Sequence, residues 1–149
     1  MIPIIFINSR SVPFVDMIIN SEKIFETRSR DVLRFLFESG QRFLIAETGN
    51  GKPLVRCSAR IKGITVVYTE EEWNSYRLFH SVPVGSEFDW KPGTKKKVMY
   101  QLDDVHSVPV PFNPPEGKRH GRTWMELSCR LPFPSTAEEC EQFFTSKKN

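Results

Sequence analysis

Cysteine is scarce in this sequence: three cysteines in 149 residues, with no Cys-x-x-Cys pair. A small secreted domain held by disulfides would carry a denser, even-numbered set, so that class is excluded. Sparse cysteines favour free thiols in a reducing compartment, and we expect a cytoplasmic protein, or a nuclear one if the source is eukaryotic. The three histidines are isolated from one another and from the cysteines. No metal site and no cofactor is therefore predicted.

The sequence also lacks a run of about 18 apolar residues, which a transmembrane helix requires, so no contact with a membrane is predicted. No basic segment precedes the apolar stretch at its start, unlike in a secretory signal peptide. Neither a glycine-rich phosphate loop nor a Gly-x-Ser-x-Gly motif is present. A P-loop nucleotide site and a serine nucleophile of that type are therefore not indicated. Because no heptad repeat is sustained, we expect a monomer.

Charge is nearly balanced overall but unevenly distributed along the chain. Residues 1–90 carry eleven basic and eleven acidic side chains, whereas residues 91–130 carry eight basic and four acidic ones. Two basic clusters in the second segment are candidates for sequence-independent attraction of RNA phosphates. They consist of Lys95, Lys96, Lys97, Lys118, Arg119 and Arg122. Ordinary solvated loops are the alternative interpretation of both clusters.

The pattern of apolar residues predicts short strands with a few short helices between them. The predicted strands are 3–8, 23–28, 43–48, 54–67, 98–102 and 123–127; the predicted helices are 12–20, 70–80 and 137–145, with a helical turn at 31–39. The strands are too close together for repeated β-α-β crossovers. We therefore expect an α+β fold, a small mixed or antiparallel β-barrel with flanking helices, since closure removes exposed sheet edges. Residues 1–130 would form this domain, and residues 131–149 a helical extension and tail.

Several aromatic residues are candidates to stack on unpaired bases. Core positions are the favoured interpretation for Trp73 and Trp124, whereas Trp90 lies in a polar segment and is the better candidate for exposure. Ser9 and Arg10 follow the first predicted strand, where backbone N–H groups at the start of a helix attract anions. Ordinary helix capping by Ser9 or Ser11 is the alternative interpretation.

The segment Lys23-Ile24-Phe25-Glu26-Thr27-Arg28 carries the most informative pattern. In a strand, Glu26 and Arg28 share one face, and Lys23 and Thr27 lie on the other. A glutamate beside an arginine predicts an ion pair, and such a pair has two interpretations. It braces the fold, or it binds a ligand, with the arginine or lysine contacting a phosphate and the glutamate accepting a hydrogen bond from a base amino group.

This segment, with the buried strand, Pro13 and the short helix that precede it, resembles the signature of the ASCH domain family in the PUA-like superfamily. The family pattern reads Gly-x-Lys-x-x-Glu-x-Arg, and Lys23, Glu26 and Arg28 keep its spacing. The resemblance implies a PUA-like barrel whose cleft, walled by this motif, binds RNA or a modified nucleotide. It implies that Lys23, Glu26 and Arg28 bind the ligand, and we expect Ser9 and Arg10, at the start of the first helix, to assist them.

Some relatives resemble amidohydrolases that act on N4-acetylcytidine through a lysine, a threonine and a glutamate, and others have been proposed to cut single-stranded RNA. Lys23 matches the lysine, but Glu26 stands where the threonine would fall, and the catalytic glutamate could only be sought among Glu70, Glu71 and Glu72. We therefore expect RNA or nucleotide binding, and we lean against catalysis. A hydrolase that uses Lys23 and Glu26 is one alternative, and a protein-interaction module that uses segment 108–115 and the C-terminal helix is another.

Overall fold

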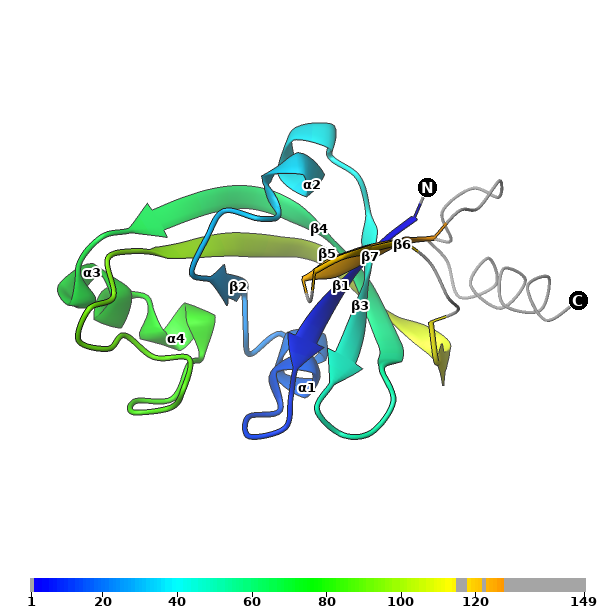
Figure 1. The fold of residues 1–149 in the computed structure, drawn as a ribbon, viewed down its shortest axis with the longest axis horizontal. Helices are drawn as coiled ribbons and strands as arrows, with labels where there is room; N and C mark the ends of the chain where they lie inside the picture. Colours follow the sequence, from blue (N-terminus) through cyan, green and yellow to red (C-terminus); the bar gives the residue numbers. More distant parts are fainter. Residues whose placement is uncertain (1, 115–117, 122, 128–149) are drawn as a thin grey trace, which may run out of the picture.

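A computed structural model describes residues 2–114, 118–121 and 123–127 of the chain (Figure 1). Its centre is a seven-stranded mixed sheet in the order β2-β5-β4-β3-β1-β7-β6. The strands are β1 (Ile2–Asn8), β2 (Phe25–Arg28), β3 (Phe43–Thr48), β4 (Leu54–Val67), β5 (Lys97–Phe112), β6 (Lys118–His120) and β7 (Trp124–Leu127). The helices are α1 (Phe14–Ile19), α2 (Arg34–Ser39), α3 (Glu70–Ser75) and α4 (Arg77–His80).

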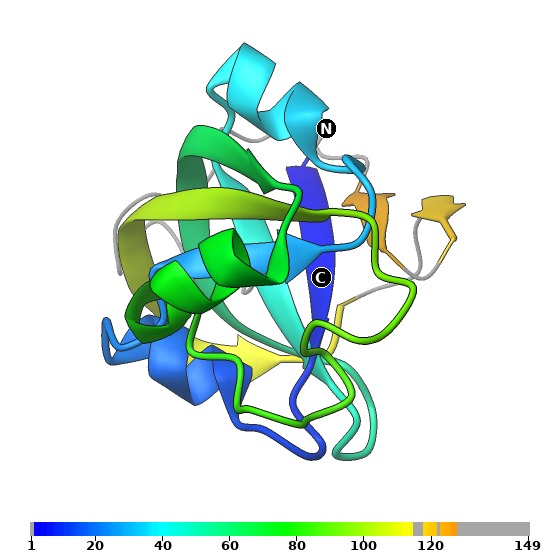
Figure 2. The same ribbon diagram turned by 90° about the vertical axis from the view of Figure 1, so that its left-hand side faces the viewer.

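The predicted α+β class is confirmed, but a closed barrel is not. In the described part of the chain the sheet ends at β2 on one side and at β6 on the other, and these two strands are not paired. Seen along the sheet, the strands curve around one another without forming a complete ring (Figure 2). The helix predicted at 137–145, with the whole extension 131–149, lies outside the described residues.

Strand β1 organises the core because both of its faces are buried. Ile5 and Ile7 belong to the larger hydrophobic cluster, and Ile4 and Phe6 belong to a second cluster on the opposite face. This two-sided burial explains the continuous apolar run of the strand. Strand β1 pairs in parallel with β3 and antiparallel with β7, so it stands between the main sheet and the β6–β7 hairpin.

Capping residues and apolar periodicity predicted the positions of most helices, and the structure corrects two of these predictions. Helix α1 begins at Phe14 rather than residue 12, and the hydroxyl of Ser11 does not cap it but donates to Glu87. Helix α3 has the predicted cap, with the Glu72 N–H donating to the Thr69 hydroxyl at 3.1 Å. The predicted helix 70–80 is divided at Tyr76 into α3 and α4. None of the helices within the described residues has the length and apolar character needed to cross a membrane.

Strands β3 and β4 have the predicted bounds, but β5 is longer than predicted. Its pairing with β2 covers only Val98 to Gln101, and the strand then continues through Pro109 and Pro111 to Phe112. Strand β2 does not cover this second half of β5, so the prolines interrupt no ladder on that side. Residues 108–112 of the proline-rich segment are therefore part of a strand.

Candidate functional site

A cleft of about 520 Å³ lies between the end of β1 and strand β2. Its lining comprises Phe6, Ile7, Asn8, Phe14, Glu26, Thr27, Arg28, Ser29, Thr48, Glu87, Phe88 and Lys97. The two neighbouring residues Glu26 and Thr27 both line it, whereas strand alternation predicted opposite faces for them. The reason is that β2 is an edge strand of the described sheet and the cleft runs along its unpaired side.

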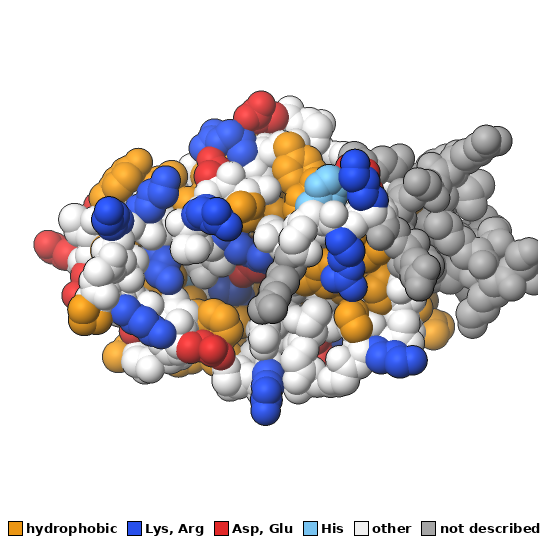
Figure 3. Space-filling view, in the orientation of Figure 1, with side chains coloured by type: hydrophobic (Ala, Val, Ile, Leu, Met, Phe, Trp, Pro, Cys, Tyr) orange, Lys and Arg blue, Asp and Glu red, His pale blue; other side chains and the backbone are white. Residues whose placement is uncertain are grey.

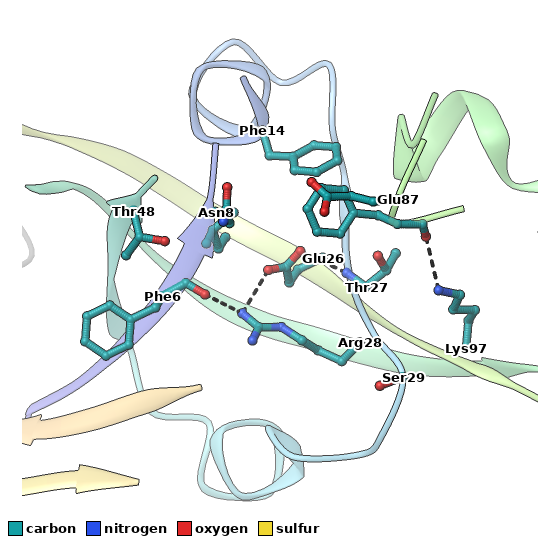
Figure 4. Close-up of a pocket in the computed structure, with 12 residues that line it drawn as sticks. Phe6, Asn8, Phe14, Glu26, Thr27, Arg28, Ser29, Thr48, Glu87 and Lys97 are labelled. Atoms are coloured by element: carbon teal, nitrogen blue, oxygen red, sulfur yellow. Dashed lines mark hydrogen bonds and ion pairs between the residues drawn. The ribbon is translucent and has the colours of Figure 1, made fainter. Parts of the chain in front are cut away.

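The predicted ion pair between Glu26 and Arg28 is present on one side of the cleft (Figure 4). The Arg28 guanidinium donates to the Glu26 carboxylate at 3.0 Å and to the backbone carbonyl of Phe6 at 2.8 Å. The other oxygen of Glu26 accepts the N–H of Thr27 at 3.0 Å. The pair is mostly buried, with side-chain exposures of 19% for Arg28 and 7% for Glu26. It therefore links β2 to β1 and presents polar groups to the cleft at the same time.

Lys23 lies behind the cleft rather than in its lining. Its side chain is buried, and its ammonium donates to the carbonyl of His80 at 2.6 Å. The same nitrogen lies 4.5 Å from the centre of the Phe14 ring, which does line the cleft. Burial lowers the pKa of Lys23 from 10.5 to about 8, with Glu26 opposing the shift and Arg28 adding to it. The motif thus places a buried amine of lowered pKa behind the cleft.

Ser9 and Arg10 do not line the cleft. Ser9 is buried, and its hydroxyl accepts the N–H of Val15 at 3.3 Å, which corresponds to the capping interpretation. Arg10 is exposed, and its backbone N–H donates to the Asn8 side chain at 2.9 Å. Asn8, rather than its two successors, contributes the polar group at the end of β1. A ligand-binding role for Ser9 and Arg10 stays a prediction.

The basic clusters are divided between the cleft and the outer surface. Lys97 lines the cleft and donates to the carbonyl of Phe88 at 3.1 Å, and burial lowers its pKa. Lys95 and Lys96 are exposed and lie outside the lining. Lys118 and Arg119 lie exposed on β6, and Arg122 lies outside the described residues. On the face drawn in Figure 3, Lys and Arg side chains are spread widely rather than gathered into one patch.

The loop between α4 and β5 forms one wall of the cleft through Glu87 and Phe88. The buried carboxylate of Asp89 anchors this loop, accepting from the Trp73 indole at 2.7 Å and from the Gly85 N–H at 2.8 Å. These donors, with Arg77, hold the pKa of Asp89 far below its usual value, although desolvation opposes them. Phe88 also packs edge-to-face on Phe14, with ring centres 5.4 Å apart. The wall is therefore rigidly held.

The sequence did not single out Glu87, Phe88, Phe14 or Phe6 as site residues. The single available signal was an apolar Phe88 within a polar segment, since a phenylalanine in such a loop usually packs against something. These residues are brought together at the cleft by contacts between distant parts of the chain, such as the hydrogen bond between Trp73 and Asp89. The periodicity of the sequence does not reveal such contacts.

No tryptophan lines the cleft. Trp73 is fully buried and stacks on His80, as the core interpretation predicted. Trp124 is sandwiched, with His120 stacked 3.9 Å away and Phe35 tilted at 4.4 Å. Trp90 packs against the main core, so the expectation that it is the exposed tryptophan is wrong. Any aromatic contact in the cleft comes from phenylalanine.

Within the described ranges, no group of three or more His, Cys, Asp or Glu side chains is arranged to hold a metal ion. Glu70, Glu71 and Glu72, the glutamates considered for catalysis, lie in the first turn of α3 and are not part of the cleft lining. The charged side chains that line the cleft are Glu26, Glu87, Arg28 and Lys97. Their formal charges balance.

No family model and no curated protein sequence matches this chain. Solved structures do match. The crystal structure of ASCH from Zymomonas mobilis superposes with a TM-score of 0.65 at 20% identity, covering 96% of this chain and 93% of that one. This chain has the ASCH fold. Two further structures of the Zymomonas mobilis protein, a serine-to-alanine and a tyrosine-to-phenylalanine mutant, match with the same score and identity and cover 97% of this chain.

The likeness confirms at the level of the fold what the segment from Lys23 to Arg28 indicated. At 20% identity it does not transfer the function of any residue. The ASCH fold places the sequence motif beside the cleft, but the chemistry of that cleft has to be argued from the residues of this chain.

Proposed function

We propose that this ASCH-fold protein binds single-stranded RNA or a modified nucleotide in the cleft between β1 and β2. The observation that carries the proposal is the combination of phenylalanine rings with the buried pair of Glu26 and Arg28 in one open cleft. A volume of about 520 Å³ falls in the range of small-molecule sites. Mixed apolar and polar lining suits a flat base with hydrogen-bonding edges.

The polar groups retain capacity for a ligand. Each carboxylate oxygen of Glu26 has one protein donor within the described residues, whereas a carboxylate oxygen accepts about two hydrogen bonds. Glu26 can therefore accept a base amino group while it keeps Arg28, as glutamate does with cytosine N4. Asn8 and Thr48 add neutral polar groups on the opposite side, and the Phe14 and Phe88 rings offer apolar contact.

The test is an amide-shift NMR titration of the labelled protein with a mixed-sequence single-stranded RNA at low and physiological salt. Saturable shifts at Glu26, Thr27 and Arg28 that persist at physiological salt support the proposal. Shifts confined to Lys95, Lys96 and the β6 cations that vanish with salt mean nonspecific attraction and overturn it. No shifts at all overturn RNA binding and leave a modified nucleotide or a protein partner as the ligand.

A matched pair of variants makes the test specific to the cleft. Phe88→Ala removes an apolar group from the lining, whereas Phe37→Ala removes a partly exposed phenylalanine from α2 that does not line it. The proposal expects weaker RNA binding for Phe88→Ala alone.

One observation favours a second candidate, hydrolysis of an acylated cytidine. A buried lysine with a pKa of about 8 beside a carboxylate is the condition that an activated amine requires near neutral pH. Thr27 also lines the cleft, contrary to the expectation from strand alternation. Incubation with N4-acetylcytidine and detection of released acetate tests this candidate. Turnover that is lost in Lys23→Met supports it, and binding without turnover leaves the protein a binding module.

A further inference from the structure

The cations of the cleft are already engaged by the protein. Arg28 donates to the Phe6 carbonyl and to Glu26, and Lys97 donates to the Phe88 carbonyl. Glu87 adds an exposed carboxylate to the lining. A free phosphate would therefore meet as much negative as positive charge, and the cleft suits the uncharged base of a nucleotide better than its phosphate.

A cation outside the lining packs on one of the lining residues, Phe6. Phe6 stands at the end opposite Lys97 (Figure 4), and the guanidinium carbon of Arg119 lies 4.3 Å from the centre of the Phe6 ring. Arg119 is exposed, and none of the carboxylates in the described residues forms an ion pair with it. Its charge remains available to a ligand.

The position of Arg119 is fixed by the backbone of Phe6. The Phe6 N–H donates to the carbonyl of Thr123 at 3.0 Å, and its carbonyl accepts from Arg28. Strand β7 pairs with β1, and β6 pairs with β7 with Arg119 opposite Met125. Phe6 thus contacts Arg28 of the motif, lines the cleft and is hydrogen-bonded to the residue that precedes β7. The contact of Arg119 with Phe6 engages the face of the ring, and it engages none of the N–H groups of Arg119 in a described ion pair, so these donors can bind a phosphate.

We infer that a nucleic acid strand leaves the cleft over Phe6, and that Arg119 binds the phosphate next to the base held in the cleft. This inference rests on the proposed function and deepens it. It makes the ligand a strand of at least two nucleotides that runs from the Lys97 end toward β6, rather than a free nucleoside. It also distinguishes Arg119, which packs on the lining residue Phe6, from the exposed lysines Lys95 and Lys96.

Calorimetric titrations with cytidine and with a single-stranded cytidine pentanucleotide test the inference. Arg119→Gln should weaken pentanucleotide binding several-fold at low salt and leave cytidine binding unchanged. The slope of log affinity against log salt should become shallower by about 0.7, the contribution of one phosphate contact in a single strand. Arg119→Lys should restore most of the slope. Lys62→Gln, which removes an exposed cation from β4 outside the cleft lining, is the control for lost charge.

The outcomes separate this inference from the proposed function. If the pentanucleotide shifts the amides of Glu26, Thr27 and Arg28 but the salt slope is the same for wild type and Arg119→Gln, the inference is wrong and the cleft proposal stands. If wild type binds neither probe, the inference is wrong, and so is the proposal that the cleft binds unmodified RNA. An equal loss of affinity in Arg119→Gln and Lys62→Gln means diffuse attraction and also overturns the inference.

Discussion

Arg28 on β2 donates to the carbonyl oxygen of Phe6 on β1 at 2.8 Å, joining two strands that are not neighbours in the described sheet. The same guanidinium pairs with Glu26. One geometry therefore fits both interpretations of the pair. Arg28 braces β2 against β1, and the same guanidinium orients the Glu26 carboxylate in the cleft.

Removing this contact should destabilise the protein. Arg28→Ala leaves the buried carboxylate of Glu26 and the Phe6 carbonyl without their donor, and we expect a loss of about 3 kcal/mol in the free energy of unfolding. Urea denaturation measures it. Arg34→Ala, which removes an arginine from the more exposed ion pair with Asp31, is the matched control and should cost much less. Equal denaturation midpoints for wild type and Arg28→Ala would contradict the brace.

Lys23 should make stability rise with pH on the alkaline side. Between pH 8 and 10.5 the folded chain has released a proton from Lys23 that the unfolded chain still holds, so the free energy of unfolding increases with pH. Relative to Lys23→Met, the wild type should gain about 3 kcal/mol over this interval. Urea denaturation at a series of pH values measures the difference. The same substitution at exposed Lys62 controls for the loss of a lysine, and parallel profiles for wild type and Lys23→Met would refute the prediction.

Asp89 should stabilise the loop wall of the cleft at neutral pH but not in acid. Because its folded pKa is held below 3.8, its contribution is present above that value and is lost as the pH falls below it. Asp89→Asn should cost about 2 kcal/mol at pH 7, since charged acceptors make the stronger hydrogen bonds. The difference from wild type, followed by tryptophan fluorescence during urea denaturation, should shrink in acid. Asp103→Asn, at an exposed carboxylate, is the control; a constant difference would count against the argument.

Two glycines of the β3–β4 turn provide a matched pair. Gly49 and Gly51 both have positive φ, 94° and 98°, so an alanine at either position is strained by about 1 kcal/mol. A Cβ at Gly49 would lie 2.8 Å from both the Arg10 Cβ and the Asn8 side-chain oxygen, whereas a Cβ at Gly51 meets open space. Gly49→Ala should therefore be clearly less stable than Gly51→Ala in urea denaturation. The added methyl group should also displace Asn8 from the cleft lining. Equal stabilities of the two variants would show that Arg10 and Asn8 move away from it without loss of stability.

The parts of the fold that depend on local chemistry could be predicted from the sequence. Strands 43–48 and 54–67 were located correctly because apolar residues mark both strands and glycines mark the turn between them. The ion pair of Glu26 and Arg28 followed from their spacing along one strand. Each of these features is determined within a few residues of sequence, where periodicity and turn chemistry act.

The features that the sequence did not reveal depend on distant contacts. The burial of Lys23 requires the carbonyl of His80, 57 positions away, and a pattern along one strand cannot report it. Strand alternation placed Thr27 away from the ligand because it describes only the direction of side chains, whereas the unpaired backbone edge of β2 brings successive residues to the cleft. Only residues 98–102 of β5 were predicted as a strand. The prolines that follow lack the N–H that a ladder needs, and the sequence does not show that β2 leaves that half of β5 unpaired on one side.

Those prolines have a consequence for association between copies of this protein. Among the described strands, none pairs with the second half of β5 on the side where β2 pairs with the first half, so this half is an edge that an unfolded chain or a second copy could extend through backbone hydrogen bonds. Pro109 and Pro111 carry no N–H, so two positions along this edge offer nothing for an incoming strand to accept. The residues that made the strand hard to recognise also protect it from templating aggregation.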